Sequence, residues 1–284
     1  MQDEMLTLTN GRTLALRHAG GHGPVVVYLH GSPMSRLDVD TFEVEGRARD
    51  VSVVGMDRPG CGASTFMPFT FASVADDVAA VADHLGTDRV QIIGHSSGAC
   101  YALAAAAFRP DRIGSVVAAG VVPPYLPDQE WWSMLSDGEQ RGVRLIGVDD
   151  VEAERLLADA DRDYMDLLDD DAGLIRRWWE DSGPADRRVL DAGLGALIVR
   201  STRESLRQGQ KGWARDSIVR MGPWAFDLAD IRVPVTLVHG DQDYGPGLEW
   251  IAERIPDVRV EVVADRGHLF VLAEPEVALD ALDL

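Results

Sequence analysis

One short segment of the sequence combines a serine with flanking glycines in a pattern typical of covalent chemistry. Gly94-His95-Ser96-Ser97-Gly98 fits the spacing G-x-S-x-G of a nucleophile elbow, a sharp strand-to-helix turn that exposes a serine hydroxyl. The apolar run Val90–Ile93 precedes it and a stretch of small residues follows, as the elbow requires. The glycines allow close backbone approach, and the start of the helix places a positive dipole end beside Ser96. The pattern predicts that Ser96 is a nucleophile.

A serine hydroxyl needs a base to take its proton, and the base needs a carboxylate to hold it in one tautomer. Of the seven histidines, we expect His268 to be the base, because it lies in a compact turn just after a buried strand. His30 and His239 each precede a glycine at a strand end, where we expect hydrogen bonds that brace a loop. The acid should follow the preceding strand, where both Asp241 and Asp243 lie. Local chemistry does not choose between them, because either could bond its own backbone in a turn.

The elements that must position these residues follow from hydrophobic periodicity. Continuous apolar runs predict strands buried on both faces, separated by stretches with helical spacing. The predicted strands are Val25–Leu29, Val51–Met56, Val90–Ile93, Ile113–Ala119, Val233–His239 and Val258–Val263. Before them, Asn10-Gly11 between two alternating segments predicts an antiparallel hairpin. The sequence therefore predicts an α/β fold with a mostly parallel sheet, an N-terminal antiparallel hairpin, and helices on both faces.

This alternation is interrupted before the last two predicted strands. Residues 122–231 show helical periodicity without a convincing strand. We expect this insertion to form a helical cap, with residues 1–121 and 232–284 together forming the core domain.

The insertion is rich in tryptophan and in acidic residues. It holds Trp131, Trp132, Trp178, Trp179, Trp213 and Trp224. We expect at least one of them to reach a substrate pocket, although the adjacent pair Trp178-Trp179 cannot both face inward from one helix surface. The acidic segment 149–171 has no calcium-loop pattern, so we expect a solvated helix face there.

Composition excludes several classes of protein. The 284 residues carry 27 Lys+Arg and 47 Asp+Glu, a formal net charge of −20, so nucleic acid is not an expected partner. Cys61 and Cys100 show no metal-ligand spacing, and we expect no metal and no cofactor. No apolar run approaches the roughly 18–20 residues that span a bilayer, and no signal-peptide pattern occurs. We expect a soluble cytoplasmic protein with no membrane partner, and the sequence leaves open a homo-oligomer.

Five landmarks, in this order, resemble the α/β-hydrolases, in particular the capped serine hydrolases that include esterases, lactonases and proline iminopeptidase-like enzymes. They are His30-Gly31-Ser32-Pro33, Asp57-Arg58-Pro59-Gly60-Cys61-Gly62-Ala63-Ser64, the elbow, Gly240-Asp241-Gln242-Asp243 and Gly267-His268. The resemblance implies that Asp243 is the acid, which gives the family's chain order Ser96, Asp243, His268. It also implies an oxyanion hole made by the backbone N–H groups of Ser32 and Ser97. For residues 57–64 we expect a structural turn without a direct catalytic role.

The resemblance further implies an enzyme, a serine hydrolase that needs no cofactor. We expect it to cleave an ester or lactone of a small, largely apolar molecule through an acyl-enzyme on Ser96. Serine at the elbow disfavours an aspartate-nucleophile epoxide hydrolase or dehalogenase. Iminopeptidases usually read His-Gly-Gly-Pro-Gly where this chain reads His30-Gly-Ser-Pro-Met34, which weakens an aminopeptidase interpretation. The alternatives are an amide or C–C bond hydrolase of the iminopeptidase or β-diketone hydrolase type, a lyase or cyclase, or a ligand-binding protein of secondary metabolism.

Overall fold

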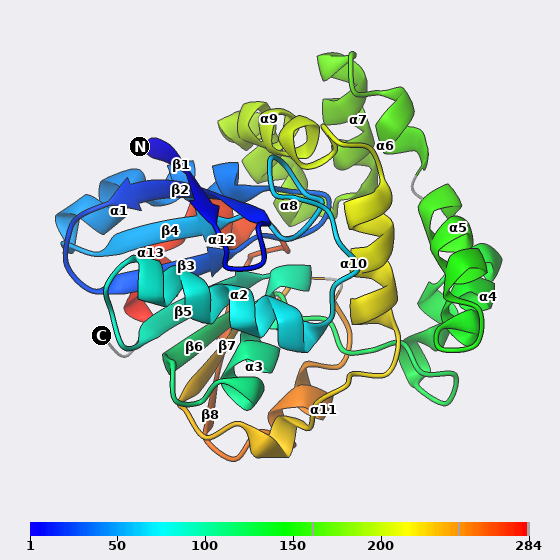
Figure 1. The fold of residues 1–284 in the computed structure, drawn as a ribbon. Helices are drawn as coiled ribbons and strands as arrows, with labels where there is room; N and C mark the ends of the chain where they lie inside the picture. Colours follow the sequence, from blue (N-terminus) through cyan, green and yellow to red (C-terminus); the bar gives the residue numbers. More distant parts are fainter. Residues whose placement is uncertain (161, 244, 283–284) are drawn as a thin grey trace.

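The computed structural model of the protein describes residues 1–160, 162–243 and 245–282. Within them, eight strands form one sheet in the order β1-β2-β4-β3-β5-β6-β7-β8 (Figure 1). The strands are β1 (Gln2–Thr7), β2 (Thr13–Gly20), β3 (Val25–Leu29), β4 (Ser52–Met56), β5 (Val90–His95), β6 (Ile113–Ala119), β7 (Val235–Gly240) and β8 (Val258–Val263). The pairs β1–β2 and β2–β4 are antiparallel, and the other neighbours are parallel. The predicted sheet type is confirmed.

The N-terminal hairpin has a wider turn than Asn10-Gly11 alone suggests. Thr7 pairs with Thr13, so residues 8–12 form the loop. Gly11 adopts a φ of 81°, a conformation that glycine reaches at little cost. The dipeptide therefore marks the turn correctly but does not fix where the two strands end.

Helices cover both faces of the sheet. One face carries α2 (Phe71–His84), α3 (Ser97–Phe108) and α11 (Leu248–Ala252), and the other carries η1 (Arg36–Phe42), α1 (Glu43–Ala48), α12 (Phe270–Ala273) and α13 (Pro275–Asp280). Successive residues of β3 alternate between these two cores. Val27 and Leu29 lie in the first core, whereas Val26 and Tyr28 lie in the second. Burial on both faces explains why this strand is a continuous apolar run in the sequence.

Residues 122–231, here called the helical insertion, connect β6 to β7. Its helices are η2 (Glu130–Met134), α4 (Asp137–Leu145), α5 (Asp150–Ala160), α6 (Arg162–Asp166), α7 (Asp171–Asp181), α8 (Pro184–Val189), η3 (Leu190–Leu194), α9 (Gly195–Ser205), α10 (Lys211–Met221) and η4 (Leu228–Asp230). No strand lies in its described residues, as expected. In Figure 1 the green and yellow helices α4 to α10 stand beside the sheet. Two small apolar clusters, one around Leu157 and one around Trp213, give the insertion cores of its own.

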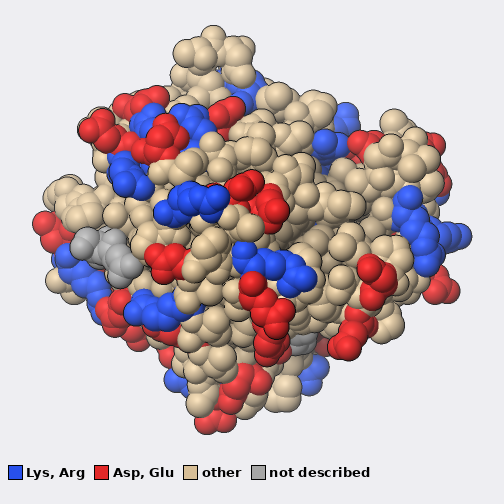
Figure 2. Space-filling view, turned by 90° about the horizontal axis from the view of Figure 1, so that it is seen from below, with Lys and Arg blue, Asp and Glu red and all other residues tan. Residues whose placement is uncertain are grey.

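The surface carries acidic and basic side chains side by side on the face shown in Figure 2. Arg155 of α5 illustrates this mixing, because it pairs with Glu152 and Asp159 along the same helix. The acidic segment 149–171 is thus mostly helical where the structure describes it, with Ala153 and Leu157 on a buried face and charged side chains such as Arg155 and Asp159 on the exposed face. Its residue 161 lies outside the described residues. Among the described helices, none is long and apolar enough to cross a membrane.

Candidate active site

Ser96 lies at the junction between β5 and α3, in the strained backbone that a nucleophile elbow requires. Its φ and ψ are 55° and −120°. A Cβ atom at Gly98 would lie 1.9 Å from the carbonyl oxygen of Leu29, and one at Gly94 would lie 2.5 Å from the carbonyl oxygen of Gly98. Because both contacts are with backbone that cannot move aside, these two positions require glycine. The predicted elbow geometry is present.

His268 and Asp243 meet in a hydrogen bond at the ends of two neighbouring strands. The His268 Nδ1 atom lies 2.9 Å from Asp243 Oδ2 and 3.1 Å from Oδ1. Because an ionised carboxylate only accepts hydrogen bonds, Nδ1 carries the proton and Nε2 is the nitrogen that can act as a base. Asp241, the other acidic candidate, is exposed and accepts a hydrogen bond from the backbone N–H of Arg266. The structure thus brings Asp243, not Asp241, to the histidine.

The charges of this pair shift both pKa values. Burial alone would raise the pKa of Asp243, but the positive charge and the hydrogen bond of His268 outweigh it and hold the pKa well below its usual value. Burial lowers the pKa of His268, and the Asp243 carboxylate more than reverses this effect, so the net pKa of His268 is raised. The aspartate therefore stays ionised and favours the imidazolium that forms when His268 takes a proton.

The backbone brings the elbow and His268 side by side. The N–H of Ser96 donates to the carbonyl oxygen of Ala119 at 2.8 Å, and a Cβ atom on the next residue, Gly120, would lie 3.0 Å from the His268 ring. The ring of His95 packs against that of His268, with centroids 5.2 Å apart. Its Nε2 lies 2.9 Å from the His268 carbonyl oxygen, and because a carbonyl oxygen only accepts, Nε2 is the donor. Burial lowers the pKa of His95 to about 3, so this brace stays neutral.

Ser32 and Ser97, the two predicted oxyanion-hole residues, lie next to each other at the elbow. Ser32 follows β3, and Ser97 is the first residue of α3, where backbone N–H groups have no acceptor within the helix. Their hydroxyl oxygens are 2.9 Å apart. His30 braces the Ser32 loop as expected, with its Nδ1 2.7 Å from the carbonyl oxygen of Gly31. His239 instead lies near the acid, with Nδ1 3.8 Å from Asp243 Oδ2.

A cavity of about 170 Å³ connects His268 and Ser32 with the helical insertion. Its lining residues are Ser32, Pro33, Glu139, Tyr164, Trp178, Asp181, Ser182, Asp186, Trp213, Arg220, His268 and Leu269. Trp178 and Trp213 both line this cavity, and a role for them in substrate binding stays a prediction. Trp179, the neighbour of Trp178, faces outward under the guanidinium group of Arg187, 3.9 Å from its ring centre.

The insertion also supplies a contact that the sequence did not reveal. Asp186 of α8 is buried and accepts hydrogen bonds from the backbone N–H groups of His268, at 2.9 Å, and Leu269, at 2.7 Å. A Cβ atom at Gly267 would lie 2.4 Å from Asp186 Oδ1, so glycine leaves room for the carboxylate. The only signal in the sequence is the glycine before the histidine, and it says nothing about the partner.

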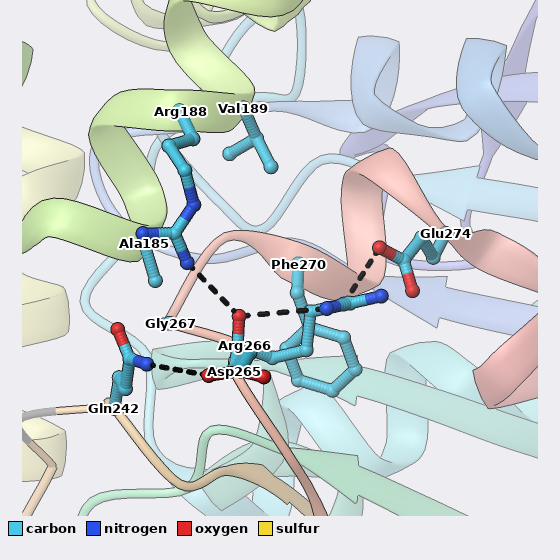
Figure 3. Close-up of a pocket in the computed structure, with 9 residues that line it drawn as sticks. All are labelled: Ala185, Arg188, Val189, Gln242, Asp265, Arg266, Gly267, Phe270 and Glu274. Atoms are coloured by element: carbon cyan, nitrogen blue, oxygen red, sulfur yellow. Dashed lines mark hydrogen bonds and ion pairs between the residues drawn. The ribbon is translucent and has the colours of Figure 1, made fainter.

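A second cavity, of about 480 Å³, lies beside the same histidine loop (Figure 3). Arg188 of α8 reaches across it to the carbonyl oxygen of Asp265 at 3.2 Å, while Arg266 pairs with Glu274 at 2.7 Å. Gln242, next to the acid Asp243, donates to the Asp265 side chain. The loop that carries His268 is therefore held by α8 as well as by the core.

A buried ion pair lies beneath the elbow. Arg58 and Asp216 are both fully buried, and Arg58 Nε lies 3.0 Å from Asp216 Oδ1. Within the turn of residues 57–64, the Ser64 hydroxyl also donates to the Asp57 carbonyl oxygen at 2.8 Å. The turn is therefore held by its own hydrogen bonds, and the sequence did not predict the contact of Arg58 with the insertion. No group of His, Cys, Asp or Glu side chains in the described residues is arranged to hold a metal ion.

A serine on a strained strand-to-helix turn, beside a histidine and an aspartate at the ends of later parallel strands, is the arrangement of an α/β-hydrolase. The sequence profile of the alpha/beta hydrolase family matches residues 26–281. The chain belongs to this family, and its relatives indicate a hydrolase.

Individual relatives cover most of the chain. A non-heme haloperoxidase from Rhodococcus erythropolis is 27% identical over 243 residues, which cover 78% of this chain and 76% of the relative. A 2-(acetamidomethylene)succinate hydrolase from Mesorhizobium japonicum is 26% identical over 276 residues, covering 95% and 90%. Among solved structures, the enol-lactonase from Burkholderia xenovorans is similar with a TM-score of 0.69 and 18% identity, covering 99% of this chain and 98% of its own. The structural likeness shows the shared fold.

Proposed function

We propose that the protein is a serine hydrolase that cleaves an ester or a lactone of a small molecule through an acyl-enzyme on Ser96. Its catalytic residues are Ser96, His268 and Asp243, and the backbone N–H groups of Ser32 and Ser97 form the oxyanion hole. The observation that carries the proposal is the Asp243–His268 hydrogen bond beside a serine held at a φ of 55°. An esterase and a lactonase among the structural neighbours agree with this chemistry.

The reaction follows from the tautomer that Asp243 imposes. His268 Nε2 takes the Ser96 proton as the hydroxyl oxygen attacks the carbonyl carbon, and the oxyanion accepts hydrogen bonds from the two N–H groups. Collapse breaks the bond to the alcohol oxygen, which receives the proton from His268. Water, deprotonated by the same nitrogen, then attacks the acyl carbon, and Ser96 leaves with that proton. The net result is one water consumed, one acid and one alcohol formed.

The cavity lined by His268 and Ser32 supports a more specific proposal for the substrate. Tyr164, Trp178 and Trp213 present aromatic rings, whereas Glu139 and Arg220 bring charge. The sequence predicts a largely apolar substrate, and this mixed lining leads us to propose a molecule with an apolar or aromatic part and a polar part. A volume of about 170 Å³ lies below the roughly 300–1,000 Å³ of common ligand sites, which favours a small acyl group.

We propose that the helical insertion acts as the cap over Ser96, because seven of the residues lining this cavity come from α4, α6, α7, α8 and α10. They are Glu139, Tyr164, Trp178, Asp181, Asp186, Trp213 and Arg220. The core contributes the reacting groups, and the insertion covers them. We expect exchange of helices from this insertion to change substrate preference while leaving the chemistry intact.

The proposal is tested with p-nitrophenyl esters of increasing acyl length and a small set of lactones. We expect turnover of short or aryl acyl groups by the wild-type protein and its loss in Ser96→Ala. Hydrolysis in water labelled with oxygen-18 should place one label in the acid product. Turnover that survives in Ser96→Ala, or an unlabelled acid, would contradict the proposal, and absence of turnover on all substrates would favour a ligand-binding protein.

A further inference from the structure

The side chains of the two oxyanion-hole residues share one buried network. Arg58 Nη2 donates to Ser32 Oγ at 3.1 Å and to Ser97 Oγ at 3.0 Å. The Ser32 hydroxyl also contacts Asp216 Oδ2, and the two serine hydroxyls are 2.9 Å apart. The loop after β3 and the first turn of α3 are therefore joined through their side chains as well as through the sheet.

The direction of each hydrogen bond in this network is determined. A carboxylate only accepts, so the single proton of Ser32 points to Asp216. Because that proton is already used and Arg58 only donates, the bond between the two serines runs from the Ser97 hydroxyl to the Ser32 oxygen. Burial alone would raise the pKa of Asp216, but the positive charges of Arg58 and Arg220 outweigh it, so the pKa is lowered and the carboxylate stays ionised. Every proton of the two hydroxyls thus has one assigned acceptor.

Asp216 comes from the insertion, whereas its partners come from the core. It lies on α10, whose first turn packs on the turn that follows β4. A Cβ atom at Gly212 would lie 2.5 Å from the carbonyl carbon of Gly60, so this close backbone contact depends on glycine at position 212. The guanidinium group of Arg58 also lies over the ring of Tyr101, 4.8 Å from its centre, and donates to the His30 carbonyl oxygen at 2.5 Å. The carboxylate is therefore fixed relative to the sheet.

We infer that Asp216 is a positioning residue, which holds the backbone N–H groups of Ser32 and Ser97 in place for the oxyanion through the Ser32 hydroxyl and Arg58. This inference rests on the proposed function and deepens it. It assigns a role to the Ser32 hydroxyl, which joins Asp216 and Arg58 in this network. The oxyanion hole is complete only when α10 of the insertion is seated on the core.

The test compares Ser32→Ala and Asp216→Asn with the wild-type protein, and Asp191→Asn serves as a matched control. Asp191 is an exposed aspartate of the same insertion. For p-nitrophenyl acetate we expect each test variant to lower kcat by about 10- to 100-fold, with little change in KM. This fall in kcat should not exceed the fall caused by removing one hydrogen-bond donor of an oxyanion hole. The control should keep wild-type kcat and KM.

Two further measurements separate positioning from a general structural role. Benzeneboronic acid forms a tetrahedral adduct with an active serine. Its affinity should fall in both variants by the same factor as kcat, whereas inhibition by acetate should match that of the wild type. The double variant Ser32→Ala/Asp216→Asn should lose no more than the more impaired single variant, because both changes break one link.

Wild-type kcat and boronate affinity in Ser32→Ala would overturn the inference, as would losses that multiply in the double variant. If Asp216→Asn does not fold, Ser32→Ala decides alone, because it removes only one oxygen atom. Failure of the proposed function has a different signature, namely unchanged turnover in Ser96→Ala.

Discussion

The two halves of the candidate site are built in different ways. The reacting half, Ser96 with Asp243 and His268, lies in the turns that follow β5, β7 and β8, so the parallel strands place it at one edge of the sheet. The supporting half comes from helices of the insertion: Asp186 holds the histidine loop, and Asp216 holds the serine loop. On the proposed function, the sheet supplies the reacting groups, and the insertion positions them through the two buried carboxylates of Asp186 and Asp216.

The largest effect should come from removing the nucleophile of the reacting half. Ser96→Ala should lower kcat by on the order of 10⁴- to 10⁶-fold, the loss seen when a triad serine is removed while binding remains. Initial rates on p-nitrophenyl acetate measure this, and near-UV circular dichroism checks that the variant is folded. If kcat fell no further in Ser96→Ala than in Asp216→Asn, the division into a reacting half and a supporting half would be wrong.

The next largest effect should come from the acid. Asp243→Asn should lower kcat by about 10⁴-fold, because an amide no longer fixes the His268 tautomer that exposes Nε2 as the base. Asp241→Asn is the matched control, since Asp241 is exposed and bonds only the loop backbone among its described contacts. Equal losses in the two variants, measured as kcat at pH 8, would show that the acid has been misassigned.

The buried ion pair tests how strongly the insertion is tied to the core. Arg58→Ala leaves the Asp216 carboxylate buried without its main partner, and breaking such a pair costs about 3–5 kcal/mol of unfolding free energy. Urea unfolding followed by tryptophan fluorescence measures the change. Arg155→Ala, which removes exposed helix pairs, should unfold as the wild type does. An Arg58→Ala midpoint equal to that of Arg155→Ala would contradict the account.

The smallest effect should be a shift in pH dependence caused by Asp186. The base must be neutral to accept a proton, so kcat/KM falls as the pH drops through the pKa of His268. Asp186 and Asp243 both raise that pKa. We therefore expect the acid limb of the kcat/KM profile to move to lower pH in Asp186→Asn, together with a fall in kcat of about 10-fold or less from looser positioning.

The other titratable neighbours of His268 do not reverse the direction of this expected pH shift. The pKa values of His95 and His239 are lowered, in both cases mainly by burial, so both rings stay neutral where His268 titrates. Asp191→Asn, an equal change of charge on the neighbouring turn, should leave the acid limb in place. An unchanged limb in Asp186→Asn would show that this carboxylate does not act on the histidine.

Much of the reacting half could be predicted from the sequence. Buried strands are continuous apolar runs, and parallel order forces their carboxyl ends to one edge, so Ser96 and His268 were expected to meet. Local chemistry could not separate Asp241 from Asp243, because both follow the same strand. The resemblance to a family favoured Asp243, and the hydrogen bond to His268 agrees with it.

The supporting half could not be predicted in this way. Asp186 and Asp216 sit on amphipathic helices where an aspartate is ordinarily solvent-facing, and only the packing of α8 and α10 on the core turns them inward. Asp186 bonds backbone N–H groups, and Asp216 bonds a serine hydroxyl and the distant Arg58, so neither aspartate has a partner that sequence spacing reveals. The contacts of Arg58 could not be predicted either. It lies in the turn of residues 57–64, and the glycines and proline of that turn already explain the shape of the turn.

The most direct test of the central claim is to locate the covalent adduct formed with a fluorophosphonate probe. Intact-protein mass spectrometry of the wild type should show one added label per chain, and peptide mapping should place it on Ser96. The Ser96→Ala variant should remain unlabelled under the same conditions. A label on any other residue, or equal labelling of the variant, would contradict the assignment of Ser96 as the nucleophile.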